Sequence, residues 1–310
     1  MSIREQLVSA ATKAGGSFKS IDDRKRHANQ LADYLMANNI QIRTPEQLKQ
    51  KHVIGWIAAA KDDGNKDRSL QNKLTSVRTL LRAAGLDRKA DAILTKEFGC
   101  DNACRDGVRQ ALPRLTIMAM IKLVKATDPG VGAGLDLQAN LGLRQLEAIR
   151  GGRLDTLKRW ERELCVPGGR LRVLEGSKTK RERFVLPVNR EETLRAVREA
   201  IAVAQRHKSG RLIEIRDLKS AVNHYNYVAA KVGFIGVHSP HSLRYAWAQE
   251  AFERYLAAGL SDREAAIAVG HDLGHGDGRG RFIKRVYCQA KHRPSETVQP
   301  TAEPELEPST

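Results

Sequence analysis

Apolar residues recur every three or four positions through most of this chain, which is the spacing of one face of an α-helix. Such helical stripes occur in residues 20–39, 69–85, 114–126, 133–150, 194–201, 218–232 and 243–255. Alternation with the two-residue period of a β-strand is confined to two short runs, 170–175 and 182–188, separated by a polar turn. These patterns predict a mainly α-helical protein with one small β-hairpin.

The 310 residues are enough for two domains. Clear periodicity is lost between Gly99 and Pro113, so we expect a linker there. The expected organisation is a helical domain over residues 1–107, a second domain over 108–292 and a tail over 293–310. Because the tail is rich in Pro, Glu, Ser and Thr, it is expected to be an acidic, disordered end.

The chain is strongly basic, with a formal net charge of +17 and an isoelectric point near 9.9. This charge favours a polyanionic partner, with nucleic acid first and an anionic membrane surface second. No run of 18 apolar residues occurs, so no transmembrane helix is expected. The N-terminus lacks the apolar stretch of a signal peptide, so we expect a cytoplasmic location.

The sequence gives little support for a metal ion or a cofactor. Cys100 and Cys104 are four residues apart, but no second pair of Cys or His completes a zinc site, so reduced thiols are expected. The glycine-rich GHGDGRG follows no expected strand and lacks the lysine of a phosphate-binding loop. We therefore expect no bound cofactor.

Separate pieces of the sequence carry side chains suited to holding and cutting a phosphodiester. They are Arg144 in GLRQLE, Lys178 in the hairpin turn GSKTK, His241 and Arg244 in HSLR, His275 in LGH, and Tyr287 at the end of RGRFIKRVY. The first of them falls near the end of the apolar pattern in 133–150, which is expected to form one continuous helix. The other five side chains come after Arg144 in the chain, in the order given.

In this order the motifs resemble those of the tyrosine recombinases, also called phage-type integrases. The resemblance covers about residues 114–290, which it implies to be the catalytic domain. The helical N-terminal part resembles the core-binding, DNA-binding domain of that family by its type of structure and not by a motif.

Two of the assigned positions have an alternative. Family members commonly have a shorter spacing between the late His and the Tyr than the twelve residues from His275 to Tyr287. His275 is preferred for its Leu-Gly context, and His271, sixteen residues from Tyr287, is the alternative. Lys180 is the alternative to Lys178.

The resemblance implies that Tyr287 attacks the phosphorus of DNA and forms a 3′-phosphotyrosyl link. Arg144 and Arg244 would bind the nonbridging oxygens with fixed pairs of charged donors. Because the covalent link conserves the energy of the broken bond, rejoining would need neither ATP nor a metal ion.

The remaining side chains would move protons. His241 would accept the proton of the tyrosine, and Lys178 would protonate the leaving 5′-hydroxyl. His275 would donate a hydrogen bond to a phosphate oxygen. The implied protein is a site-specific DNA recombinase, an integrase that inserts or excises a mobile element. It would act on double-stranded DNA as a homotetramer at synapsis, with accessory DNA-bending proteins as further partners. The alternatives are a non-catalytic DNA-binding protein on the same fold and an enzyme like a type IB topoisomerase.

Overall fold

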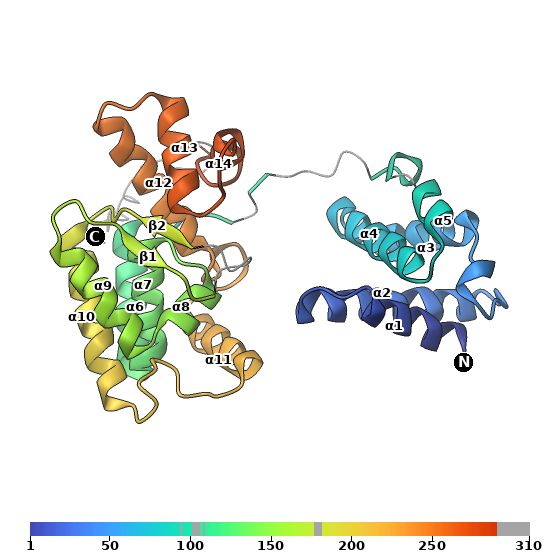
Figure 1. Ribbon diagram of the computed structural model, residues 1–310, viewed down its shortest axis with the longest axis horizontal. Coiled ribbons are helices and arrows are strands. Elements are labelled where there is room, and N and C mark those ends of the chain that lie inside the picture. Colours follow the sequence, from blue (N-terminus) through green and yellow to red (C-terminus); the bar gives the residue numbers. More distant parts are fainter. Residues whose placement is uncertain (94, 101–105, 108, 177–181, 290–310) are drawn as a thin grey trace, which may run out of the picture. The chain divides into compact units, whose positions relative to one another are not determined.

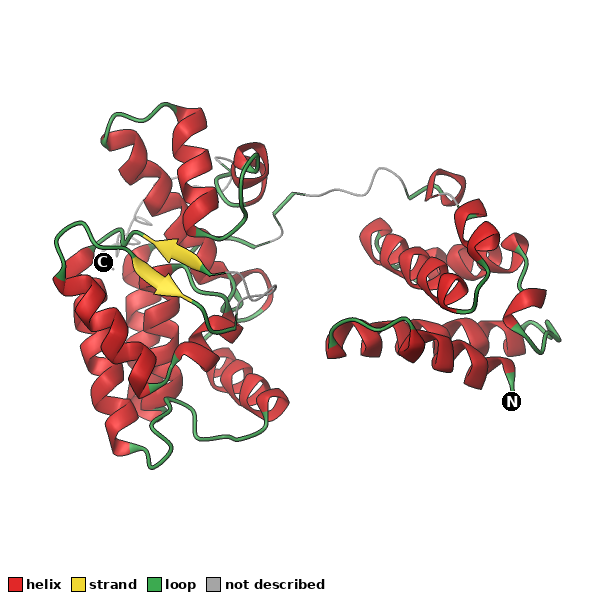
Figure 2. Ribbon diagram, viewed as in Figure 1, coloured by secondary structure: helices red, strands yellow, loops and turns green. Residues whose placement is uncertain are grey.

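The computed structural model describes residues 1–93, 95–100, 106–107, 109–176 and 182–289 (Figure 1). Several positions named above lie outside the described residues: Cys104, Lys178, Lys180 and the tail 293–310. The described elements are helices apart from one two-stranded sheet (Figure 2), so the expected fold class is confirmed.

The chain divides into two compact units, an N-terminal unit (Met1–Arg105) and a C-terminal unit (Asp106–Thr310). The N-terminal unit contains α1 (Ile3–Lys13), α2 (Phe18–Ala37), η1 (Pro45–Gln47), α3 (Gln50–Asp62), α4 (Asp67–Ala83), α5 (Asp87–Ala92) and η2 (Thr95–Phe98). The apolar stripes of α2 and α4 form its core, where Leu31, Leu35, Leu70 and Leu74 are fully buried.

The C-terminal unit contains α6 (Arg114–Thr127), α7 (Pro129–Leu141), α8 (Gln145–Gly151), α9 (Leu154–Cys165), β1 (Leu171–Val173), β2 (Arg183–Val185), α10 (Arg190–Arg206), α11 (Leu218–Lys231), η3 (Gly236–His238), α12 (Ser242–Ala257), α13 (Asp262–Asp272) and α14 (Gly280–Val286). The strands β1 and β2 are antiparallel, with Leu171 opposite Val185. They form the hairpin that the alternating pattern predicted.

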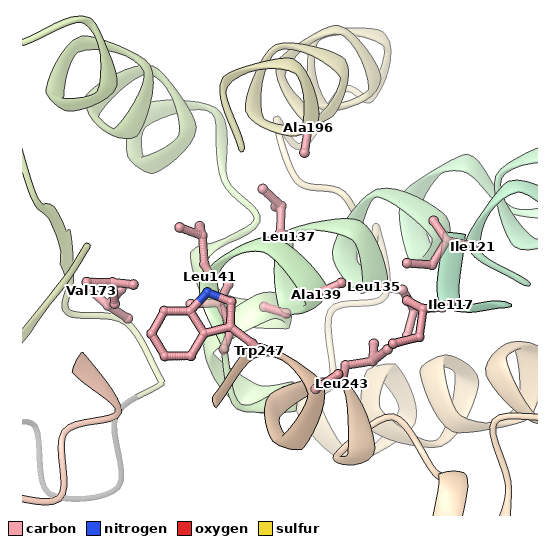
Figure 3. Packing of buried hydrophobic residues seen from close by; sticks show 14 of the residues in the cluster. Ile117, Ile121, Leu135, Leu137, Ala139, Leu141, Val173, Ala196, Leu243 and Trp247 are labelled. Carbon is pink, nitrogen blue, oxygen red and sulfur yellow. The ribbon is translucent and has the colours of Figure 1, made fainter. Parts of the chain in front are cut away.

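Helix α7 lies at the centre of the C-terminal unit and packs against α6, α10 and α12 (Figure 3). Every residue from Gly130 to Leu141 is buried. Its polar side chains have partners from neighbouring helices: Lys125 and Arg195 form ion pairs with Asp136, at 2.5 Å and 3.4 Å. Such pairing removes the cost of burying an isolated carboxylate.

The expected single helix over 133–150 is wrong, because the chain breaks between α7 and α8. Gly142 ends α7 in the left-handed conformation, with φ of 56°. A Cβ at this position would lie 2.6 Å from the indole of Trp247 on α12, so only glycine fits. The break turns the chain so that α8 starts afresh, with Arg144 as the residue before its first turn.

Gly142→Ala should lower the free energy of unfolding of the C-terminal unit by about 2–5 kcal/mol. Left-handed strain costs about 1–2 kcal/mol, and overpacking against Trp247 adds about 1–3 kcal/mol. The matched control is Gly259→Ala, because Gly259 has φ of 88° but no atom near its added Cβ. Urea unfolding of the full chain, followed by Trp fluorescence in a Trp56→Phe background, reports on the C-terminal unit alone. Equal losses for the two variants would contradict the packing role of Gly142.

Candidate active site

Arg144 is held at the start of α8 by Glu147, three residues later. Nη1 of Arg144 donates to Oε1 of Glu147 at 2.7 Å, and its backbone N–H donates to Oε2 at 2.8 Å. Nη2 of Arg144 also donates to the carbonyl of Leu273, after α13, at 3.3 Å. The guanidinium is therefore fixed at both ends while about a quarter of its side chain stays exposed.

Arg244, in the first turn of α12, is completely buried. Its two terminal nitrogens donate to the carbonyls of Gly142 and Leu273, so it joins the end of α7 to the end of α13. Its Nη1 lies 4.0 Å from Oε2 of Glu147. The two arginines that the motifs indicated thus share one carboxylate and the carbonyl of Leu273.

Tyr287 follows α14, and its hydroxyl lies 3.3 Å from Nε2 of His275. Its ring lies 5.9 Å from the guanidinium carbon of Arg244. Nε2 of Gln249 on α12 donates to the carbonyl of Tyr287 at 3.0 Å, which fixes the backbone at that point. The structure therefore brings Tyr287, His275 and Arg244 together from three separate helical segments.

His241 caps the start of α12 and is connected to Tyr287 through a third ring. The centroid of Tyr245 lies 5.7 Å from that of His241 and 4.6 Å from that of Tyr287. Among the described residues, the hydrogen-bond partner of the Tyr287 hydroxyl is Nε2 of His275 and not His241. The alternative histidine, His271, is about half exposed and lies 3.0 Å from Asp277.

Sequence reasoning did not single out Arg183, which is the third guanidinium of this cluster and, with Arg244, one of the two that are buried. Its Nη2 donates to Oε2 of Glu147 at 2.7 Å, and its Nη1 donates to the carbonyl of Asp272. A signal for it exists in the sequence: the alternation in β2 makes Arg183 and Val185 point inward while Phe184 is 45% exposed. An arginine at an inward position of a strand needs a buried acceptor.

The cluster has a surplus of positive charge, because three guanidiniums face the single carboxylate of Glu147. Burial would raise the pKa of Glu147, but Arg183, Arg244 and Arg144 together lower it to about 2. Nε of Arg183 and Nε of Arg244 are buried without a hydrogen-bond partner among the described residues. The surplus positive charge of this cluster favours the binding of an anion beside it.

The two histidines of the site are neutral near pH 7. Burial, followed by the charges of Arg244 and Arg144, lowers the pKa of His275 to about 3. Burial, followed by the charges of Arg244 and Arg109, lowers the pKa of His241 to about 4. A neutral imidazole can accept a proton, and the surrounding guanidiniums favour an anionic group over a cationic one.

Lowering the pH from 7 to 5 should destabilise the C-terminal unit. His241 and His275 stay unprotonated in the folded chain but take up protons near pH 6.5 when it unfolds, so stability falls as pH falls from about 6.5 toward their folded pKa values. Each contributes at most about 1.4 kcal/mol per pH unit. Thermal unfolding between pH 7 and 5 should show a shallower decline for His275→Gln. The same slope as wild type would mean that the pKa of His275 is not depressed.

In the described part of the chain, no three His, Cys, Asp or Glu side chains are grouped to bind a metal ion. Cys100 is buried in the N-terminal unit. No described helix is long and apolar enough to cross a bilayer.

Sequence comparison places the chain in a family. The model of the family described as Integrase matches residues 99–250, and the model described as Phage integrase, N-terminal matches residues 1–90. The chain belongs to the phage-integrase family, the tyrosine recombinases, as its motifs predicted. A search of curated protein sequences finds no match.

Several solved structures share the fold. A lambda integrase tetramer bound to a Holliday junction is 16% identical, with a TM-score of 0.58 over 96% of this chain and 80% of that chain. A lambda integrase dimer bound to a COC′ core site is 15% identical, with a TM-score of 0.59 over 97% of this chain and all of that chain. The Tn1549 transposon integrase in complex with transposon right end DNA is 13% identical, with a TM-score of 0.56 over 92% and 94%. At these identities the likeness establishes the common fold.

Proposed function

We propose that this chain is a site-specific DNA recombinase that cleaves and rejoins DNA through a 3′-phosphotyrosyl intermediate at Tyr287. The observation that carries the proposal is the position of the Tyr287 hydroxyl, which contacts His275 beside the buried guanidinium of Arg244. Integration or excision of a mobile element is the biological reaction that this chemistry serves. It would take place on DNA in the cytoplasm.

In the proposed reaction, the scissile phosphate binds between Arg144 and Arg244. Their guanidiniums neutralise the charge that develops on the nonbridging oxygens, which is the largest contribution expected from such a site. The phosphate charge would also offset part of the arginine charge and so raise the pKa of His275 toward its ordinary value. His275 could then take the phenolic proton as Tyr287 attacks phosphorus.

His241 and a lysine of the hairpin turn complete the proposed reaction. His241 is the second candidate for the proton acceptor, and it would otherwise bind a phosphate oxygen from the start of α12. Lys178, or Lys180 in its place, would protonate the leaving 5′-oxygen. Both lysines lie in the turn between β1 and β2, outside the described residues.

DNA would contact both units. On the N-terminal unit, a hollow of about 620 Å³ between α2 and α4 is lined by polar side chains that include Arg24, Arg26 and Lys73. Basic and amide side chains in such a hollow suit the phosphate backbone. The lambda integrase structures contain dimers and a tetramer on DNA, so we propose that this chain also assembles as a tetramer when two sites are paired.

The test is formation of a covalent protein–DNA adduct. The full chain is incubated with a pool of nicked duplexes of randomised sequence, denatured and separated by size, and the attached DNA is sequenced. Wild type should retain DNA covalently, and Tyr287→Phe should retain none. Tyr227→Phe, at an exposed tyrosine on α11, is the matched control and should behave as wild type.

Absence of an adduct across the whole pool would favour a non-catalytic DNA-binding protein. An undiminished adduct with Tyr287→Phe would refute the assignment of the nucleophile. Relaxation of supercoiled plasmid by isolated monomers, without pairing of two sites, would instead indicate an enzyme like a type IB topoisomerase.

A further inference from the structure

We propose that Arg183 is a positioning residue for DNA cleavage: it holds Glu147 and the chain before His275, and so fixes the groups that bind the scissile phosphate. This role rests on the proposed function. Arg183 is placed behind the reacting groups, because its terminal nitrogens donate to Glu147, Asp272 and Gly142. Arg244 is just as buried, but it lies against the ring of Tyr287. It acts through Arg144, Arg244 and His275.

The first part of this role is to hold the Glu147 carboxylate in place with a hydrogen bond and a positive charge. Oε2 of Glu147 receives Nη2 of Arg183 and the backbone N–H of Arg144, and Oε1 receives Nη1 of Arg144. Nη1 of Arg244 is also within 4.0 Å of Oε2. Without Arg183, this fully buried carboxylate would turn toward the remaining guanidiniums. It would then neutralise the charges that must face the phosphate.

The second part of this role is to set the path of the chain into His275. Nη1 of Arg183 donates to the carbonyl of Asp272, and Arg144 and Arg244 both donate to the next carbonyl, that of Leu273. All three guanidiniums therefore hold the chain at the end of α13. Three residues after Asp272 the chain reaches His275, whose Nε2 lies beside the Tyr287 hydroxyl.

Gly274 shows how closely the stem of Arg183 packs against this segment. Gly274 has φ of 69°, and a Cβ added to it would lie 2.8 Å from Cδ of Arg183. The glycine of the Leu-Gly-His element is therefore required both by its left-handed backbone and by the arginine next to it. The Arg183 side chain is thus one of the contacts that fit strand β2 to the histidine segment, beside the hydrogen bond from Leu186 N–H to Oδ1 of Asp272.

The role is tested by single-turnover adduct formation on two nicked duplexes that carry a sequence selected from the pool. One duplex has an ordinary scissile phosphate, and the other has a methylphosphonate, which lacks the negative charge. Arg183→Met should slow cleavage of the ordinary phosphate by about 10–100-fold. Arg183→Lys should restore part of the rate, because a single ammonium can replace only one of the two arms. Affinity for the duplex should stay within about 3-fold, since Arg183 lies behind the reacting groups.

The methylphosphonate distinguishes positioning from stability. If Arg183 acts by keeping Arg144 and Arg244 available for charge neutralisation, the defect of Arg183→Met should shrink on the uncharged substrate, as should that of Arg144→Gln. The matched control is Arg195→Met, which removes a partner of buried Asp136 away from this cluster. It should lower the melting temperature without changing the ratio of the two rates.

Three results would overturn the role of Arg183. They are an unchanged rate in Arg183→Met, an equal defect on both substrates, and a pattern identical to that of Arg195→Met. In each of these cases the wild-type adduct would still support the proposed function. Failure of wild type to form any adduct with the ordinary phosphate would refute the proposed function, and the role of Arg183 with it.

Discussion

Arg244→Lys should slow formation of the Tyr287 adduct by about 10²–10³-fold, while the protein stays folded. The two terminal nitrogens of Arg244 are held by the carbonyls of Gly142 and Leu273, so its orientation is fixed before DNA binds. A lysine keeps the charge but has a single nitrogen, which cannot hold both carbonyls and also point at the phosphate. Single-turnover cleavage of a nicked duplex measures the effect.

Arg190→Lys is the control for this prediction. Arg190, at the start of α10, also donates to main-chain carbonyls, those of Leu164 and Gly169, but it lies outside the site. Its replacement should reduce stability without reducing the rate of cleavage by the folded protein. A rate for Arg244→Lys within 10-fold of wild type would show that the fork of Arg244 does not bind the phosphate.

Glu147→Gln should lower the free energy of unfolding of the C-terminal unit by about 3–5 kcal/mol. The substitution keeps the shape of the side chain but leaves Arg183 and Arg244 buried together without a compensating charge. Urea unfolding in the Trp56→Phe background measures the loss. Glu250→Gln is the control, since burial already raises the pKa of Glu250 and neutralising it should cost little.

Glu147→Gln should also change how the stability of the C-terminal unit depends on pH. The pKa of Glu147 is depressed from 4.5 to about 2, so its contribution is complete above about pH 4.5 and is lost as pH falls toward 2. In Glu147→Gln this part of the acid dependence should disappear. If the variant is as stable as wild type at pH 7, the carboxylate does not hold the three arginines together.

The fold class could be predicted because helical and strand periodicities are local. Stripes such as Leu70, Leu74 and Val77 need only their own neighbours to form a helix face. The break at Gly142 could not be predicted in the same way, because its cause is Trp247, more than one hundred residues later in the chain. A lone glycine inside an apolar run has no local feature that distinguishes a helix end from a tolerated residue.

The residues of the site also divide into those that a local sequence pattern indicates and those that depend on distant partners. Arg144, His241 and Arg244 stand in recognisable short motifs. For Arg183 the alternation of the strand indicates an inward side chain, but its role follows from the partners that fold around it. Glu147, Asp272 and Gly142 come from three different segments, and no spacing in the sequence connects them to β2. Sequence patterns therefore do not reveal which distant residues will pair with a buried charge.

Tyr287 contacts His275 and Arg244 of its own chain. In an assembly of several subunits, each active site would therefore use the tyrosine of its own subunit. Helix α14, which leads into Tyr287, packs against α13 of the same chain. A Tyr287→Phe subunit keeps this packing, so its site stays closed to the tyrosine of a neighbouring subunit. Mixing Tyr287→Phe with Arg244→Lys subunits should therefore restore no cleavage. Each protomer would cut only the strand that it holds itself, and a pair of inactive mutants would stay inactive together.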